Sequence, residues 1–378
     1  MAMTATERPS SGERDTQMMQ AIVAYAPGDY RLETIPVPTP GPLEVLTQVE
    51  ACGICAGDIK TYHGAPSFWG DADQPRYVKP PMTPGHEFIG RVVALGEGAA
   101  EKFGIAVGER VISEQIVPCW HCRFCNSGSY WMCQKHDLYG FQNNVNGSMA
   151  EYMLYTKEAI VHKIPEHVPI EEAILVEPLA CSLHAVDRAN VGLDDVVVVA
   201  GAGTLGLGMI GGLRLKNPKV LVVMDLSPTR LELAKRMGAD VLLNPKEVDA
   251  QAEIMKLTDG YGCDVFIEAT GFAPMVNIGM KMIRKLGRFV EFSVFRDETT
   301  LDWSIIGDRK ELDVLGAHLG PYCYPRAIRY IADRTIDVRG IVTHQFGLKD
   351  FKEAFATMES GVHSLKVVLR PGGLSDGA

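Results

Sequence analysis

The sequence predicts an α/β protein with two domains: an irregular, mainly antiparallel β domain and a domain built on a doubly wound parallel sheet. From Gln20 to about Pro118, short apolar segments are interrupted by Gly and Pro, as in short antiparallel strands. From Asp195 to about Gly320, apolar strand-like segments alternate with helical ones, which is the pattern of βαβ units. A chain of 378 residues has room for two ordinary domains with large cores.

In the first region we expect strands that include Ala21–Tyr25, Glu44–Glu50 and Gly90–Leu95. The segment before them, up to about Gln17, is polar and charged and lacks the apolar stretch of a secretion signal. We therefore expect residues 1–18 to form a disordered tail and the protein to be cytoplasmic.

The second region begins with a predicted helix, Glu177–Asn190, followed by a run of four valines that starts at Val196. The uncharged stretch from Val196 to Leu213 is nearly long enough for a membrane helix. Its glycines and its strand-turn-helix pattern indicate a buried nucleotide-binding unit instead.

The turn after the valines carries Gly201, Gly203 and Gly206, which match the G-x-G-x-x-G fingerprint of dinucleotide-binding proteins. Such glycines allow a tight turn and a close approach of the backbone to a pyrophosphate, which the following helix N-terminus faces. The next strand, Val220–Met224, ends at Asp225, about twenty residues beyond the glycines. A carboxylate there can accept hydrogen bonds from the adenosine ribose and repel a 2′-phosphate, so we expect NAD rather than NADP.

Two further strands end in polar residues: Val265–Ile267 leads into Glu268 and the turn that follows, and Phe289–Val290 leads toward Ser293. Open α/β sheets bind ligands at the carboxyl ends of their strands. The residues predicted to contact the cofactor are Gly201, Gly203, Thr204, Leu205, Gly206, Asp225, Arg230, Thr270 and Ser293.

Four cysteines, Cys119, Cys122, Cys125 and Cys133, are separated by two, two and seven residues. Zinc takes four tetrahedral ligands, and short spacers let one loop supply all four thiolates to a closed structural site. Disulfides are the alternative, but the chain shows no sign of an oxidising compartment.

A second set of candidate metal ligands lies on either side of the cysteine loop. A catalytic zinc needs few protein ligands and an open position for water or substrate. Cys55, His86 and one glutamate could supply such a set. The candidate glutamates are Glu87, next to His86, and Glu177. Spacing does not choose between Cys52 and Cys55.

These motifs give the chain a resemblance to the zinc-containing medium-chain dehydrogenases, which include alcohol, sorbitol and threonine dehydrogenases. The resemblance runs from about Met19 to about Pro371. It implies a GroES-like catalytic domain of residues 19–182 and 326–372, interrupted by a Rossmann NAD-binding domain of residues 183–325. It favours Cys55 over Cys52, because Cys-Ala-Gly-Asp matches the family's pattern at the catalytic zinc.

The resemblance also implies roles for the site residues. Cys55 and His86 are expected zinc ligands, and Glu87 or Glu177 supplies the third protein ligand, a choice that the sequence leaves open. Asp58 is expected to orient the site. A glutamate at 177, where simple alcohol dehydrogenases have a cysteine, places the chain closer to the polyol dehydrogenases.

The chain departs from the family at Gly57, where a Ser or Thr usually relays the proton of the substrate hydroxyl, and at Lys60, where the relay often continues to a histidine. We hypothesise that the proton leaves through ordered water, assisted by Glu177 or Lys60. The side chains of Tyr62, His63 and Trp69 could donate hydrogen bonds to further substrate hydroxyls.

The sequence therefore leads us to expect two zinc ions per chain and NAD as cofactor. The expected reaction is oxidation of a secondary hydroxyl of a four- to six-carbon polyol, with erythritol and threitol as candidates, to a ketose. A simple alcohol or L-threonine dehydrogenase is the alternative within the family, and a redox-silent structural protein the alternative outside it. The formal net charge of −10 and the absence of a basic stripe argue against nucleic-acid and membrane partners. The resemblance implies a homodimer or homotetramer.

Overall fold

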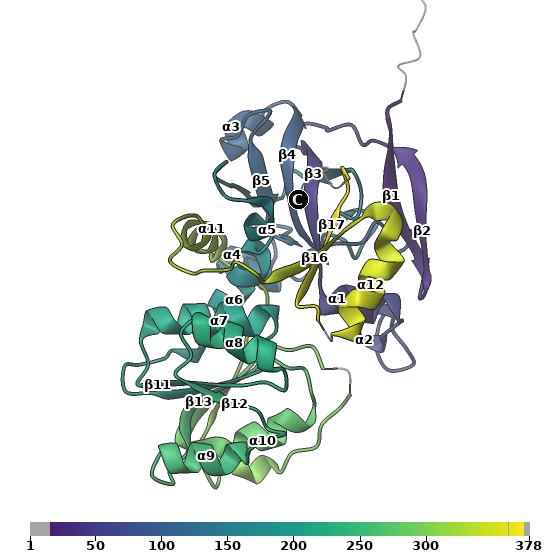
Figure 1. Ribbon diagram of the computed structural model, residues 1–378. Coiled ribbons are helices and arrows are strands. Elements are labelled where there is room, and N and C mark those ends of the chain that lie inside the picture. Colours follow the sequence, from purple (N-terminus) through teal and green to yellow (C-terminus); the bar gives the residue numbers. More distant parts are fainter. Residues whose placement is uncertain (1–15, 296, 362, 374–378) are drawn as a thin grey trace, which may run out of the picture.

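The computed structural model describes residues 16–295, 297–361 and 363–373. Two regions, each built on its own large sheet, lie one above the other (Figure 1). One region holds a seven-stranded sheet and two small two-stranded sheets, and the other holds a six-stranded sheet. The predicted fold class is confirmed.

The seven-stranded sheet has the strand order β16-β17-β3-β4-β5-β9, with β8 paired to β3. Apart from the parallel pair β16 and β17, its pairings are antiparallel. The strands of this region are β1 Met18–Ala26, β2 Asp29–Pro36, β3 Val45–Ile54, β4 Glu87–Leu95, β5 Arg110–Ser113, β6 Ile116–Val117, β7 Asp137–Leu138, β8 Tyr152–Tyr155, β9 Val161–Lys163, β16 Val342–Gly347 and β17 Lys366–Arg370. Its short helices are α1 Ala56–Tyr62, α2 Pro66–Trp69, α3 Ala99–Phe103, α4 Arg123–Asn126, α5 Ile170–Ala173 and α12 Phe351–Ser360.

The six-stranded sheet is parallel throughout, with the order β12-β11-β10-β13-β14-β15. Its strands are β10 Val196–Ala200, β11 Val220–Met224, β12 Val241–Leu243, β13 Cys263–Glu268, β14 Ile283–Glu291 and β15 Asp313–Gly316. Its helices are α6 Val176–Ala189, α7 Thr204–Lys216, α8 Pro228–Arg236, α9 Ala250–Leu257, α10 Pro274–Met282 and α11 Tyr324–Ala332. Three 3₁₀ turns complete the described structure: Tyr130–Met132, Trp303–Ile305 and Leu348–Asp350.

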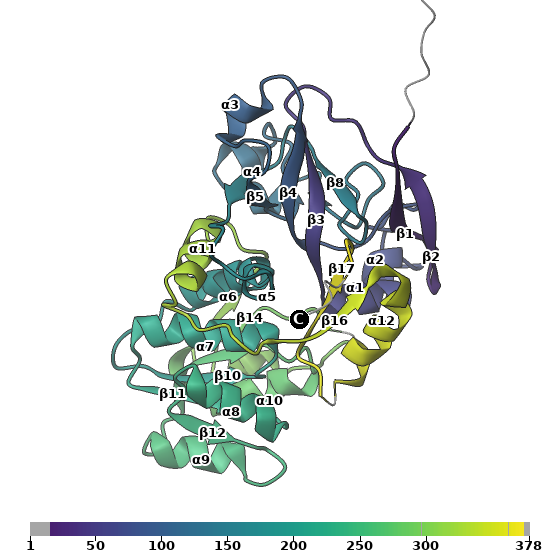
Figure 2. The same cartoon turned by 45° about the horizontal axis from the view of Figure 1, so that its top comes forward.

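Helices cover both faces of the parallel sheet, which makes it doubly wound. Val197 and Val199 of β10 face the core shared with α6, α7 and α8, whereas Val196 and Val198 face the core shared with α9 and α10. Figure 1 shows α6, α7 and α8 on one side of the sheet and α9 and α10 on the other, and Figure 2 gives a second view of the same region. Because strands buried on both faces read as continuous apolar runs, the valine run at 196–199 is explained.

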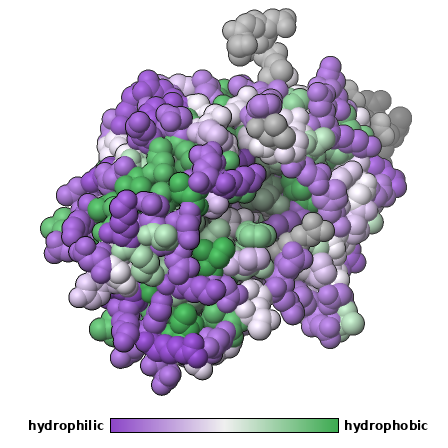
Figure 3. All heavy atoms as spheres, turned by 60° about the horizontal axis from the view of Figure 1, so that its bottom comes forward, coloured by the Kyte–Doolittle hydropathy of each residue, from purple (hydrophilic) through white to green (hydrophobic). Residues whose placement is uncertain are grey.

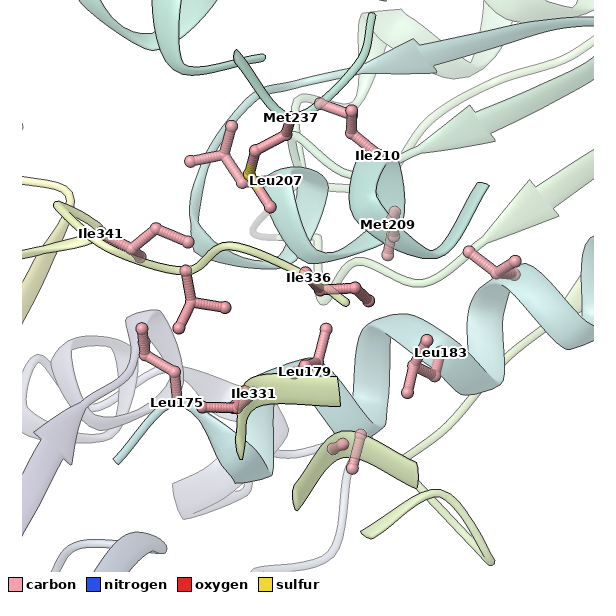
Figure 4. Close-up of a cluster of buried hydrophobic side chains, with 14 of the residues drawn as sticks. Leu175, Leu179, Leu183, Leu207, Met209, Ile210, Met237, Ile331, Ile336 and Ile341 are labelled. Atoms are coloured by element: carbon pink, nitrogen blue, oxygen red, sulfur yellow. The ribbon is translucent and has the colours of Figure 1, made fainter. Parts of the chain in front are cut away.

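The interface between α6 and α7 depends on small residues. A Cβ on Gly208 would lie 2.5 Å from Ser182 Oγ, and one on Gly211 would lie 2.7 Å from Ile336. Glycine therefore lets α7 approach its neighbours closely. Figure 4 shows Ile336 between Leu183 of α6 and the side chains of α7.

The last strands, β16 and β17, return to the seven-stranded sheet, as the expected discontinuous domain requires. The domain boundaries at residues 182 and 326 stay a prediction. Strand β1 begins at Met18, the last residue of the predicted tail, whereas residues 1–15 lie outside the described part of the chain.

None of the described helices has the length and apolar character needed to cross a membrane. Hydrophilic side chains predominate on the face shown in Figure 3, with hydrophobic patches between them.

Candidate active site

The four loop cysteines come together in space. Their sulfur atoms lie within 4.8 Å of one another, and none of the nine cysteines is in a disulfide. Cys122 caps the short helix α4, and Cys125 lies within it. The loop thus gathers a donor set suited to a closed tetrahedral zinc site.

Backbone amides around the loop favour thiolates. The N–H groups of Gln134 and Cys125 lower the pKa of Cys122 to about 6, whereas burial raises the pKa of Cys125 to about 12. The Cys119 N–H lies 3.2 Å from Cys133 Sγ. Several thiolates this close together require a cation, so the residues present fit a zinc ion.

A second cluster forms where β3 ends and β4 begins. One ligand atom each of Cys55, His86 and Glu87 lies within 4.8 Å of the others. Gly53 pairs with Glu87 across the two strands, which brings the chain just before Cys55 next to His86. This cluster contains neither Cys52, which is buried in the core, nor Glu177.

Asp58 holds two members of the cluster. Its carboxylate accepts a hydrogen bond from the Cys55 N–H at 2.9 Å, and its other oxygen lies 3.4 Å from His86 Nδ1. The two atoms do not form a hydrogen bond, so the buried Nδ1 has no hydrogen-bond partner among the described residues. Burial lowers the pKa of His86, but Asp58 and Cys55 outweigh it and hold the pKa well above its usual value. The site thus attracts positive charge, which fits a metal cation.

Glu87 has a partner that the sequence analysis missed. Lys366 Nζ, from β17, lies 2.8 and 2.7 Å from the two carboxylate oxygens of Glu87 and donates to Ile54 O at 3.1 Å. Both side chains are almost fully buried, at 3% and 2% exposure. A lysine inside an apolar strand such as Lys366-Val-Val-Leu was the available signal, because a buried lysine needs an acidic partner.

Glu177 lies in the first turn of α6 and is 5% exposed. Its Oε1 accepts hydrogen bonds from Gln115 Nε2 at 2.5 Å and from Cys181 Sγ at 3.3 Å. Burial and the nearby charge of Glu87 raise the pKa of Glu177 to about 7. Glu177 and Cys181, one helical turn apart on α6, are thus in direct contact.

Helix α1 carries two residues singled out by the sequence, Gly57 near its start and Lys60 in its last turn. A Cβ on Gly57 would lie 3.8 Å from Cys55 Sγ and 3.9 Å from His86, both ordinary contact distances. Lys60 Nζ donates a hydrogen bond to the carbonyl oxygen of Val294, which follows β14. Lys60 therefore spans from the cluster to the carboxyl edge of the parallel sheet.

Three side chains expected to line the substrate site are engaged elsewhere. Trp69 Nε1 donates to Thr61 O at 2.7 Å, and His63 pairs with Glu359 at 3.0 Å. The ring of Tyr62 packs edge-on against those of Tyr30 and Phe355. Trp69 Nε1 and His63 Nε2 thus have partners within the protein, and donation to a substrate by these three side chains stays a prediction.

The glycine turn after β10 has the expected geometry. Gly201 has φ of +100°, and a Cβ on Gly206 would lie 1.9 Å from Gly201 O. A Cβ on Gly203 would meet no atom within 4 Å. The turn therefore leaves open backbone at the start of α7. It lies where the strand order reverses: from β10 the chain builds the sheet outward to β12 on one side, and from β13 to β15 on the other, as a dinucleotide site requires.

The other predicted cofactor residues lie at the same edge, directly after β11, β13 and β14. Asp225 accepts hydrogen bonds from the N–H groups of Ala202 and Ser227, both at 2.8 Å. Thr270 binds Glu268, and Ser293 Oγ lies 3.5 Å from Glu268 O.

Three further residues of this set lie near the junction with the other region. Thr204 and Arg230 contact the backbone carbonyls of Leu365 and Ser364, and Leu205 packs against the core of α6 and α7.

Family models match two parts of the chain. Residues 41–166 match the alcohol dehydrogenase GroES-like domain, and residues 204–333 match the zinc-binding dehydrogenase domain. The first match covers the cysteine loop and the Cys55 cluster, and the second covers most of the parallel sheet.

Relatives cover the chain almost from end to end. The erythritol/L-threitol dehydrogenase of Mycolicibacterium smegmatis is 53% identical over 355 residues, which are 94% of this chain and 98% of that protein. The sorbitol dehydrogenase of Halalkalibacterium halodurans is 32% identical over 361 residues, 93% of this chain and 99% of that protein. A structure from Sinorhizobium meliloti 1021, bound to NADP, has a TM-score of 0.84 at 28% identity and covers 94% of this chain and 100% of that one.

Both metal-ligand clusters, the nucleotide turn and the end-to-end similarity to these relatives indicate the same family. The chain belongs to the zinc-containing medium-chain alcohol dehydrogenases, a family of zinc-dependent oxidoreductases that use a nicotinamide cofactor.

Proposed function

We propose that the chain oxidises a secondary hydroxyl of a four- to six-carbon polyol to a ketose, with erythritol and threitol as the first candidates and NAD⁺ as hydride acceptor. The M. smegmatis erythritol/L-threitol dehydrogenase, at 53% identity, supports the substrate class. The observation that carries the proposal is the contact of Lys60 with Val294 O. It joins the Cys55 cluster to the edge of the sheet where the nicotinamide cofactor is expected.

We propose Cys55, His86 and Glu87 as the residues that hold the catalytic zinc. Glu87 is preferred over Glu177 because its carboxylate is the one within 4.8 Å of the other two ligand atoms. When bound, zinc acts as a Lewis acid that stabilises the deprotonated form of a hydroxyl group. Lys366 offsets part of the charge of Glu87, and the Asp58 carboxylate stands beside His86 Nδ1, which leaves Nε2 to face the metal.

Glu177 is the proposed acceptor for the proton of the substrate hydroxyl, directly or through water. A pKa of about 7 suits a group that takes up and releases a proton near neutral pH. Gly57 offers no hydroxyl for a relay. The ammonium group of Lys60 is a hydrogen-bond donor to Val294 O, so its proposed part is to hold the two regions together.

The preference for NAD⁺ over NADP⁺ rests on Asp225. Its carboxylate follows β11 and stands beside the glycine turn, held by the N–H groups of Ala202 and Ser227. A negative charge there repels the 2′-phosphate of NADP. The S. meliloti neighbour is bound to NADP, so the preference needs a direct comparison of the two cofactors.

The first experiment is a turnover assay that follows NADH or NADPH formation by absorbance. It compares NAD⁺ with NADP⁺ on erythritol, threitol, longer polyols, simple alcohols and L-threonine, before and after chelation of zinc. The proposal expects polyol turnover with NAD⁺ that is lost on chelation and restored by zinc. Turnover of only simple alcohols or threonine would contradict the substrate class, and equal use of NADP⁺ would contradict the role of Asp225.

Two further parts of the proposal concern the zinc content and the oligomeric state of the protein. We expect two zinc ions per chain, the second in the loop of Cys119, Cys122, Cys125 and Cys133. A homodimer or homotetramer in the cytoplasm is proposed from the family resemblance. Light scattering of the purified protein tests the oligomeric state, and a monomer would contradict it.

A further inference from the structure

The carboxylate of Glu177 is held by a buried chain of hydrogen bonds. Gln115 Nε2 donates to Glu177 Oε1 at 2.5 Å, and Tyr324 Oη donates to Gln115 Oε1 at 2.5 Å. Tyr324 is completely buried, and Gln115 and Glu177 are 2% and 5% exposed. The three residues come from the segment between β5 and β6, from α6 and from α11.

The direction of this chain follows from which groups can donate. An ionised carboxylate only accepts, so the amide of Gln115 must turn its NH₂ group toward Glu177. Its carbonyl oxygen then points toward Tyr324, whose hydroxyl supplies the proton. Without that hydroxyl, the amide would lose the partner that fixes its orientation.

Tyr324 itself is held in place from another side. Its ring stacks on that of His162, with centroids 5.5 Å apart and an angle of 18° between the planes. His162 Nε2 lies 3.2 Å from Glu114 Oε1, and Tyr130 donates to the other oxygen of Glu114 at 2.8 Å. Tyr130 lies between two of the loop cysteines in sequence, so the support of Tyr324 reaches the cysteine loop.

The hydrogen bonds that described residues donate to Glu177 are all accepted by one oxygen, Oε1. Gln115 Nε2 and Cys181 Sγ both donate to Oε1, and Oε2 has no hydrogen bond to a described residue. We propose that Gln115 and Tyr324 are positioning residues that hold Glu177 by Oε1 and keep Oε2 free for the substrate hydroxyl. This inference rests on the role of Glu177 in the proposed function.

The test is a double-mutant cycle of Tyr324→Phe with Glu177→Gln, in which kcat and KM are measured on the polyol that the wild type turns over best. Tyr324→Phe keeps the ring and removes only the hydroxyl. We expect it to lower kcat roughly tenfold or more with little change in KM, because a misplaced reacting group is costly. In the Glu177→Gln background the same change should alter kcat less than about twofold, because the group through which Tyr324 acts is already gone.

Two further variants serve as a second test and a control. Gln115→Met tests the same chain without touching Tyr324 and should give the same split between kcat and KM. Tyr155→Phe is the matched control, because Tyr155 is also fully buried, has an unpartnered hydroxyl and lies in a different core cluster. It should leave kcat unchanged.

Zinc content, the melting temperature and its rise with saturating NADH and polyol are measured for every variant. Near-wild-type values for Tyr324→Phe, alongside the loss of kcat, support the inference. Equal losses of kcat in both backgrounds, a change in KM alone, or lost zinc would overturn it. If the wild type turned over no polyol, the proposed function would fail first, and the cycle would be run on the alcohol that it does oxidise.

Discussion

The two metal-ligand clusters of this protein are built in different ways. The cysteine loop draws its four ligands from residues 119–133, and its backbone amides favour thiolates within the same loop. The Cys55 cluster draws Cys55, His86 and Glu87 from two strand ends, and it depends on Asp58 and on Lys366, 279 residues beyond Glu87.

This difference predicts how each cluster responds to change. When a ligand is removed, the cysteine loop should lose its metal and its local fold together. The Cys55 cluster should instead lose catalytic activity while the rest of the fold stays intact. Zinc analysis, activity and unfolding measured on the same variants separate these two responses.

The largest expected effect is on the catalytic activity of the Cys55 cluster. His86→Ala removes a proposed zinc ligand and should lower kcat/KM at least about a thousandfold, because several kcal/mol of charge stabilisation are lost. One zinc per chain should remain, and the melting temperature should change little. If the variant kept both zinc ions and its activity, His86 would not be a ligand.

Lys366→Met tests whether the buried ion pair between Lys366 and Glu87 stabilises the Cys55 cluster. Removing one partner leaves a buried carboxylate without compensation, at a cost of about 3–5 kcal/mol in the free energy of unfolding. Urea denaturation measures that loss. Adding Glu87→Gln to this variant should recover most of the stability but not the activity; no recovery would mean that Lys366 acts through packing alone.

Cys122→Ser tests the closed loop. We expect the loss of one zinc per chain and about 2–4 kcal/mol of stability, since loss of a structural metal is among the large destabilising changes. The kcat of the remaining folded protein should stay within about threefold of wild type. Full zinc content and an unchanged melting temperature would refute the closed site.

The smallest effect concerns the contact between the loop and the parallel-sheet region. His136, just beyond Cys133, and His318, beyond β15, bring their Nε2 atoms to 2.9 Å. Burial, followed by the charges of His136 and His184, lowers the pKa of His318 to about 4.

Because the unfolded chain binds this proton more tightly, the contribution of His318 to stability is complete above about pH 6.5 and is lost as the pH falls toward 4. Between pH 7 and about pH 5.5 the loss should be about 1 kcal/mol. Urea unfolding at both pH values should show a smaller difference in His318→Asn than in the wild type. An equal difference in both proteins would mean that other groups carry the effect.

The same contrast explains which parts of the site could be predicted. The cysteine loop and the glycine turn depend on residues close together in the chain, and the structure places both as expected. The predicted strands and helices differ from the observed ones mainly at their ends: helix α6 spans Val176–Ala189 where Glu177–Asn190 was predicted.

The sequence by itself determined the two sheets and the four-cysteine cluster, because short spacings and periodic apolar residues constrain local structure. Its motifs carried the resemblance to the family, and that resemblance favoured Cys55 over Cys52 beside His86. Tertiary structure alone decided which glutamate lies beside Cys55 and His86, that Lys366 neutralises it, and that Gln115 and Tyr324 hold the other glutamate. It also gave Trp69 Nε1 and His63 Nε2 partners within the protein. The physical reason is that a buried charge or amide takes its partner from whichever strand or helix packs against it, and that choice leaves no periodic trace in the sequence.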